Sequence, residues 1–180
     1  MDNVTNLPAI HASVEDHVGG GLLEEKPIVA YCDGSLMTKG SAAFVVYSGK
    51  RKLFSHAEIL KGGQLCNVTC EYVAMVRMLE GLIDQQLIKK PIKVFTDYQG
   101  MTDAIKGKKI TTGLSKSATL LKLHLRVLEL AEVFSDIEID WMPRCLNTEA
   151  HELAHFELRK VLYNGSKDNH HRRLIYPRTT

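Results

Sequence analysis

The stretch Ile28-Val29-Ala30-Tyr31-Cys32-Asp33-Gly34-Ser35 contains the strongest fold signal in the chain. Its first five residues form an apolar run directly after Pro27, which predicts a short buried strand. The segment Asp33-Gly34-Ser35 is typical of a turn, so we expect the strand to end there. The sequence therefore places a carboxylate at the end of a buried strand.

Two further strands are predicted to follow this one closely. Residues 41–47 form a second apolar run, and Ser48-Gly49-Lys50 is typical of a tight turn. A third strand is expected from Leu53 to Ile59. Because the connections are short, the three strands should form an antiparallel meander.

The hydrophobic period then changes from strand to helix. Between Val68 and Leu87 the apolar residues recur three and four positions apart, which predicts an amphipathic helix; they are Val73, Val76, Leu79, Ile83 and Leu87. Pro91 prevents the helix from continuing. Residues 92–96 are predicted to form a fourth strand, and since a long helix separates it from the first strand, we expect the two to pair in parallel.

The rest of the pattern completes an α/β fold. We expect a short helix at residues 99–106, a long helix at 115–134 capped by Ser115, and a fifth strand at 137–142. Asn147 is a natural N-cap for a last helix that reaches about Tyr163. The sequence thus predicts a five-stranded mixed sheet, three antiparallel strands and then two parallel ones, flanked by helices.

Length and composition limit the number of domains and the classes of protein. With 180 residues, the chain fits one domain at 26–163, a flexible leader at 1–25 and a basic flexible tail at 164–180. The net charge of +2 permits a nucleic-acid partner without requiring one. No signal peptide is evident, so we expect the cysteines to be reduced. No apolar run is long enough to span a membrane, so we expect no membrane role. A zinc site at Cys66 and Cys70 is conceivable but lacks two ligands at a recognisable spacing.

Three acids are expected to meet at one edge of the sheet. Asp33 and Asp97 end two strands that we expect to be parallel neighbours, and Glu71 lies in the first turn of the first long helix. Carboxylates held this close repel one another, and a divalent cation with oxygen ligands relieves that repulsion. Two-metal hydrolysis of phosphodiesters uses such an arrangement. Each acid alone is also compatible with a turn or with a favourable helix-dipole position.

Four motifs in this order resemble the ribonuclease H family, type 1 fold. They are Tyr31-Cys32-Asp33-Gly34-Ser35, Asn67-Val68-Thr69-Cys70-Glu71-Tyr72, Phe95-Thr96-Asp97 and residues 141–154, which begin Trp141-Met142-Pro143-Arg144. The Glu-Tyr pair and the Pro-Arg form are similar to the archaeal and reverse-transcriptase-like branch of that family. The resemblance covers residues 27–163.

The resemblance implies an endonuclease that hydrolyses the RNA strand of RNA–DNA hybrids with two Mg²⁺ or Mn²⁺ ions. Asp33 would bridge both ions, Glu71 and Asp97 would complete the ligands, and His151 would take the fourth place. Nucleic-acid contacts are implied for Gly34, Ser35, Asn67, Arg144 and Asn147. The expected location is the cytoplasm, or wherever the replication machinery works, without secretion.

His151 departs from the family pattern, which has aspartate at this position. In one interpretation the imidazole is a metal ligand, and the site then favours Mn²⁺ over Mg²⁺. In the other, the site has lost activity, and the chain is a silent nucleic-acid-binding or connecting domain of a replication protein. Glu149 and Glu152 are expected to point away from the face of His151. His155 shares that face; it either supports a metal ligand without binding the ion or lies at the surface, and we expect a surface histidine.

Two sequence features remain: a short basic loop, and the residues that follow Asp33. Lys106, Lys108 and Lys109 are either a solvated loop or a patch that contacts phosphates. Proofreading exonucleases of the same superfold normally carry Asp-x-Glu on the first strand. Asp33-Gly34-Ser35 lacks that glutamate, which argues against an exonuclease.

Overall fold

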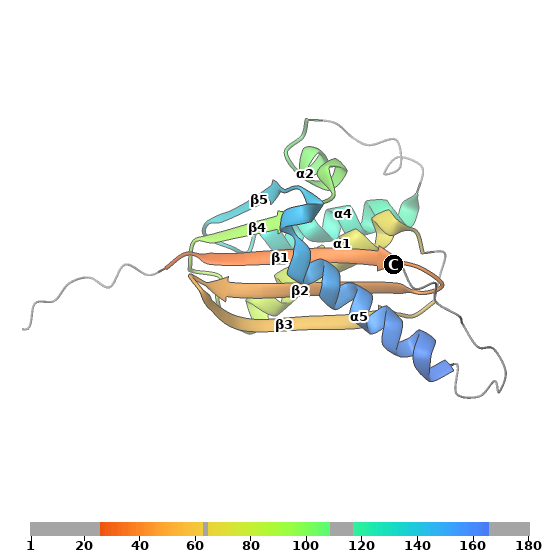
Figure 1. Cartoon of the computed structure of the whole chain (residues 1–180). Helices are drawn as coiled ribbons and strands as arrows, with labels where there is room; N and C mark the ends of the chain where they lie inside the picture. The colour runs from red at the N-terminus through yellow and green to blue at the C-terminus, as the bar shows by residue number, and fades with distance from the viewer. Residues whose placement is uncertain (1–25, 63–64, 109–116, 166–180) are drawn as a thin grey trace, which may run out of the picture.

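The computed structural model describes residues 26–62, 65–108 and 117–165. Figure 1 shows one sheet with helices packed on it. The expected leader at 1–25 lies outside the described residues, as does the expected tail from residue 166 onward. The last helix, α5 (Thr148–Gly165), continues two residues past the expected domain boundary at 163.

The sheet has five strands in the order β3-β2-β1-β4-β5. They are β1 (Ile28–Leu36), β2 (Gly40–Ser48), β3 (Arg51–Leu60), β4 (Ile92–Thr96) and β5 (Ile137–Trp141). The first three pair antiparallel, whereas β4 pairs in parallel with both β1 and β5. The predicted mixed sheet is confirmed, and β4 has the predicted bounds.

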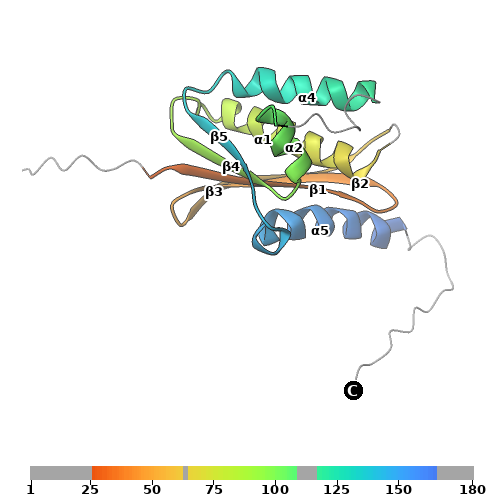
Figure 2. The same cartoon turned by 90° about the horizontal axis from the view of Figure 1, so that it is seen from above.

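Helices cover both faces of the sheet. Figure 2 shows α1 (Asn67–Asp84) and α4 (Ala118–Ala131) on one face and α5 on the other, with the short α2 (Gln99–Ile105) near the end of β4. The core lies between the sheet and α1, and its fully buried members include Ala30, Cys32, Val94, Met75, Leu79 and Leu82. Along β4 the buried and half-buried residues alternate, so Lys93 and Phe95 lie on the face of the sheet opposite α1.

Strand β1 does not end at Asp33, so the predicted turn at residues 33–35 is wrong. The strand continues to Leu36, and Asp33 and Ser35 pair with Ala43 and Ser41 of β2. Gly34 is in this strand because helix α1 crosses it closely: a Cβ built on Gly34 would lie 2.1 Å from the carbonyl carbon of Cys70. The glycine therefore marks a close approach of two backbones and not a change of chain direction.

Two predictions about helices also need correction. Helix α4 begins at Ala118, and its cap is Ser117, whose Oγ accepts a hydrogen bond from the Leu120 amide; the predicted cap, Ser115, lies outside the described residues. On α1, the predicted apolar stripe describes only part of the buried surface, since Tyr72, Met75 and Met78 are also buried. The reason is that α1 packs against both the sheet and α4, so more than one face is covered.

The described residues contain no helix long and apolar enough to span a membrane. All four cysteines are free; Cys32 and Cys70 are buried, while Cys66 and Cys145 are exposed. Cys66 stands at the N-cap position of α1 and lies 3.1 Å from the Thr69 hydroxyl. Within the described ranges, neither Cys66 nor Cys70 joins a group of three potential metal ligands.

Candidate active site

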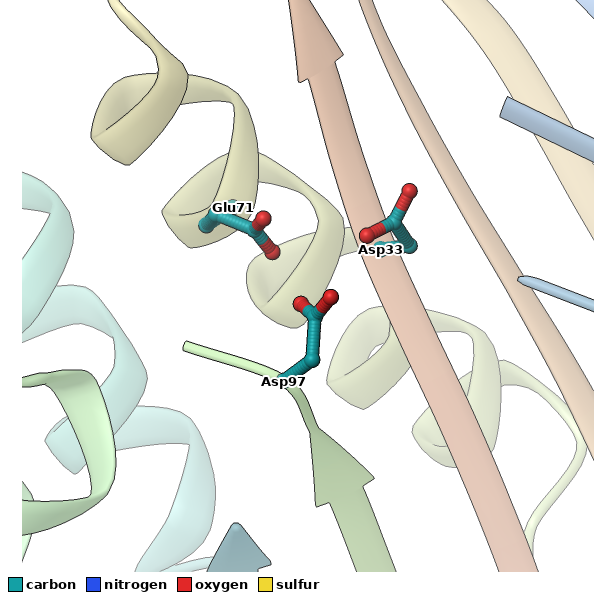
Figure 3. Close-up of side chains that lie close together, drawn as sticks. All are labelled: Asp33, Glu71 and Asp97. Carbon is teal, nitrogen blue, oxygen red and sulfur yellow. The ribbon is translucent and has the colours of Figure 1, made fainter. Parts of the chain in front are cut away.

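Three carboxylates converge from three different elements. Asp33 comes from β1, Asp97 directly follows β4, and Glu71 projects from α1. One oxygen atom from each lies within 4.8 Å of the others (Figure 3). The parallel pairing of β1 with β4 brings the two aspartates to the same sheet edge, as predicted. Glu71 is the fifth residue of α1 and so lies just past the first turn, where the sequence placed it, because α1 begins at Asn67, one residue before the predicted start.

Burial makes the negative charge of this cluster costly. Asp33 is 1% exposed, and burial, together with the nearby Asp97, raises its pKa to about 6 although the hydrogen bond with His151 opposes the shift. Burial raises the pKa of Glu71 to about 9, and the charges of Asp33 and Asp97 add to this effect. The three carboxylates repel one another when they are charged, and a bound cation relieves this repulsion. Oxygen ligands of this kind fit Mg²⁺ or Mn²⁺.

The raised pKa of Glu71 gives a prediction for metal-free protein. Since its pKa in the folded state is about 9 and its usual value is 4.5, Glu71 lowers the free energy of unfolding progressively as the pH rises from about 5 toward 9. Glu71→Gln removes the charge, so it should raise the free energy of unfolding by about 2 kcal/mol at pH 8 and by little at pH 5. Denaturant unfolding with a chelator measures this.

The matched control for this test is Glu129→Gln, which changes a glutamate that is 66% exposed on α4. It should leave the pH dependence unchanged, because the surface charge is solvated in both states. If Glu71→Gln unfolds like wild type across pH 5–9, the glutamate does not carry the buried charge that this geometry implies.

Backbone groups fix the position of Glu71. The amide of Gly34 donates a hydrogen bond to Glu71 Oε2 at 3.2 Å, and the close crossing of α1 over β1 at Gly34 permits it. Asp97 is held in a similar way. The indole Nε1 of Trp141, the last residue of β5, donates a hydrogen bond to the backbone carbonyl of Asp97 at 3.1 Å. Trp141 belongs to the closing sequence motif, but no sequence signal indicated this contact.

His151 lies beside Asp33, one member of the acid cluster. Its Nδ1 is 3.1 Å from Asp33 Oδ2, and its side chain is 26% exposed. The guanidinium of Arg144 lies 3.1–3.2 Å from the two ring nitrogens of His151 and 4.0 Å from Asp97 Oδ2. A histidine and an arginine therefore stand at the rim of the acid cluster.

His155 also belongs to this site, although the sequence suggested a surface residue. Its Nε2 lies 3.1 Å from Ser35 Oγ, and its ring contacts the ring of His151 with centroids 4.2 Å apart. Burial, with help from the nearby cations, lowers the pKa of His155. The helical spacing showed that both histidines share a face, but not that this face meets β1 at Ser35.

The predicted nucleic-acid residues occupy different environments. Asn67 is exposed at the start of α1, and Lys108 is exposed in the loop after α2. Lys106 forms an ion pair with Asp140 of β5, and Lys109 lies outside the described residues. Asn147 is 1% exposed, and its amide donates to the Cys32 carbonyl at 2.9 Å, which favours a role in joining α5 to β1.

The sheet order and the acid cluster define a ribonuclease H-like domain. A family model described as reverse transcriptase-like matches residues 32–157. The chain therefore belongs to the reverse transcriptase-like family, within the ribonuclease H proteins. No curated protein sequence matches the chain.

Solved structures of RNase H proteins share this fold. RNase H1 of the archaeon Halobacterium salinarum is 25% identical, with a TM-score of 0.65 over 74% of this chain and 98% of that one. The N-terminal RNase H domain of a Mycobacterium tuberculosis protein is 21% identical, with a TM-score of 0.67 over 78% and 99%. LC11-RNase H1, isolated from compost and solved in complex with an RNA/DNA hybrid, is 20% identical, with a TM-score of 0.62 over 75% and 99%.

Proposed function

We propose that this protein is a metal-dependent endonuclease that hydrolyses the RNA strand of RNA–DNA hybrids. The observation that carries the proposal is the cluster of Asp33, Glu71 and Asp97 at the shared edge of β1 and β4. The same fold binds a hybrid in LC11-RNase H1. Discrimination of RNA from DNA would rest on the 2′-hydroxyl groups beside the cleaved phosphate.

The three carboxylates and His151 would hold two divalent ions. Ions bound there would activate a water molecule and stabilise the leaving oxygen. Asp33 is placed to serve both ions, because one of its oxygens faces Glu71 and Asp97 in Figure 3 while Oδ2 lies beside His151. Arg144 is placed to contact a phosphate at the rim, since its side chain is 64% exposed.

The first test is cleavage of a labelled RNA–DNA hybrid with Mg²⁺ and Mn²⁺ in parallel, beside the same RNA as a single strand and as a duplex. Cutting confined to the RNA strand of the hybrid supports the proposal. Folded protein that binds the hybrid without cutting it favours the alternative, a silent nucleic-acid-binding or connecting domain. The observation that favours this alternative is that His151, beside Arg144, adds no carboxylate to the cluster of Asp33, Glu71 and Asp97.

His151→Asp should shift the metal preference toward Mg²⁺. Imidazole is a better ligand for Mn²⁺ than for Mg²⁺, whereas carboxylate suits both, so the ratio of the cleavage rate in Mn²⁺ to that in Mg²⁺ should fall about tenfold. His56→Asp, which makes the same change at an exposed position of β3, should keep the wild-type ratio. An unchanged ratio in His151→Asp would mean that His151 is not a ligand.

The loop lysines should contribute to binding through phosphate contacts. Replacing Lys106, Lys108 and Lys109 by alanine should weaken hybrid binding and make the slope of log K against log salt shallower by about one per lost contact. Lys108 should account for more of this than Lys106, which Asp140 already neutralises. Lys89→Ala, an exposed lysine before β4, is the control. Equal binding across the salt series by the triple variant would leave the loop without a role.

A further inference from the structure

Helix α4 carries apolar side chains on two of its faces. One face packs toward α1 and the core, and its buried members are Leu120, Val127 and Leu130. The other face, here called the leucine stripe, consists of Leu121, Leu125 and Leu128. Leu121 is 45% exposed and Leu125 is 48% exposed, and neither belongs to the hydrophobic core. Figure 2 shows α4 as the outermost layer on its side of the sheet, so the stripe is open to another molecule.

The spacing of the leucine stripe is typical of helices that pair with other helices. Its members are four and three positions apart, which is the seven-residue repeat found on the contact face of paired helices. A surface helix without a partner is normally polar on the side away from the core. Nucleic-acid phosphates bind Lys and Arg and not leucine, so the stripe fits the apolar face of a protein helix.

Two charges beside the stripe indicate which helix this is. Lys122 and Glu129 are exposed and seven positions apart, so they lie on the same side of α4. Lys122 forms no ion pair with any described residue. Arg126 donates to Oε2 of Glu129 at 3.4 Å, which leaves Oε1 available. A lysine in the first half of a helix and a glutamate in its last turn both oppose the helix dipole, so this order of charges is unfavourable for α4 alone.

A second copy of α4 in antiparallel orientation complements both charges. Lys122 of one copy then lies opposite Glu129 of the other, and twofold symmetry makes the same contact twice. The same arrangement packs Leu125 of each copy against Leu128 of the other. A parallel pair would instead place like charges opposite each other. The dipoles of the two helices also attract one another only in the antiparallel arrangement.

We infer that two copies of this chain form a homodimer through the leucine stripes of antiparallel α4 helices. Because α4 has only 14 residues, the contact is small, and we expect a weak dimer that forms as the protein concentration rises. The stability control at Glu129 is measured in dilute protein, where the chain is monomeric. None of the residues in this contact belongs to the acid cluster, so the inference does not rest on the proposed function.

The test is the mass of the full chain in solution across a concentration series, measured by sedimentation equilibrium. Wild type should change from monomer to dimer as the concentration rises. Leu125→Ser should raise the dissociation constant at least about tenfold, because twofold symmetry removes its apolar contact twice. The matched control is Phe156→Ser, at a residue of α5 that is 52% exposed on the opposite face of the sheet; it should keep the wild-type constant.

An exchange of charges tests the antiparallel arrangement. Lys122→Glu alone, or Glu129→Lys alone, places like charges opposite each other and should raise the dissociation constant at least about tenfold. The double variant should return to within about threefold of wild type, because the exchanged charges are complementary again. Each reversal puts a charge where the helix dipole favours it, so α4 itself should stay folded, which circular dichroism checks.

A wild-type chain that stays monomeric at every concentration overturns the inference and leaves the leucine stripe to a different protein. A dimer that Leu125→Ser does not weaken also overturns it, as does a double charge variant no stronger than the single reversals. None of these results bears on whether the protein cleaves a hybrid.

Discussion

Asp33→Asn should reduce hybrid cleavage at least about 1,000-fold while leaving the protein folded. Asp33 is the most buried of the three carboxylates and lies between Asp97 on one side and His151 on the other. Loss of its charge removes a carboxylate that would hold the divalent ions, and about 4 kcal/mol of lost transition-state stabilisation corresponds to this factor. Single-turnover cleavage in Mg²⁺ and in Mn²⁺ measures the effect.

The stability of the same variant separates a lost ligand from a damaged fold. Because burial and Asp97 already disfavour the charged form of Asp33, Asp33→Asn should be at least as stable as wild type without metal. Divalent ions should then raise its melting temperature less than they raise that of wild type. Asp136→Asn, at an exposed position before β5, should match wild type in both measurements.

Asp97→Asn is the second test of the same proposal, since it changes another carboxylate on a different strand. It should also abolish cleavage, because Asp97 is only 8% exposed and its carboxylate belongs to the same cluster. Cleavage that survives both changes would place the active site elsewhere. A folded Asp33→Asn protein that binds the hybrid as tightly as wild type would show that binding and cleavage are separable.

The order of strands was predictable because the local signals agree with one another. Strand β4 has the predicted bounds because Pro91 and Asp97 enclose a five-residue run rich in β-branched and aromatic residues. The long helix before it required a crossover, and a crossover returns the chain parallel to β1. These two facts also placed Asp33 and Asp97 at one edge, so this part of the acid cluster followed from topology.

The second part of the site depends on tertiary geometry that no local pattern encodes. Helical spacing puts His155 on the face of His151, but the contact with Ser35 depends on where α5 crosses β1. Arg144 reaches His151 because a 3₁₀ turn (Arg144–Leu146) folds it back toward the helix. Likewise, a glycine at position 34 is compatible with a turn and with a close contact between two backbones. Only the position of α1 in the fold shows that the close contact is the reason.

Gly34→Ala should be among the most destabilising single-methyl additions in this chain. The new Cβ would lie 2.1 Å from the carbonyl carbon of Cys70 and 2.2 Å from the amide nitrogen of Glu71, both in the backbone of α1. A side chain cannot rotate away from such a contact, so α1 must move off β1 and disturb the core beneath it. We expect a loss of at least about 3 kcal/mol in the free energy of unfolding, measured with denaturant.

Gly81→Ala is the matched control, because it adds the same methyl group to α1 itself. There the nearest atom, at 2.9 Å, is the outer end of the Phe44 ring, which can shift, and alanine favours the helix by about 1 kcal/mol over glycine. The free energies of unfolding of the two variants should therefore differ by several kcal/mol, although each replaces one glycine by alanine. A Gly34→Ala protein as stable as Gly81→Ala would mean that α1 can withdraw from β1 at little cost. In that case backbone contact would not hold Glu71 beside Asp33, and the cluster would need its metal ions to form.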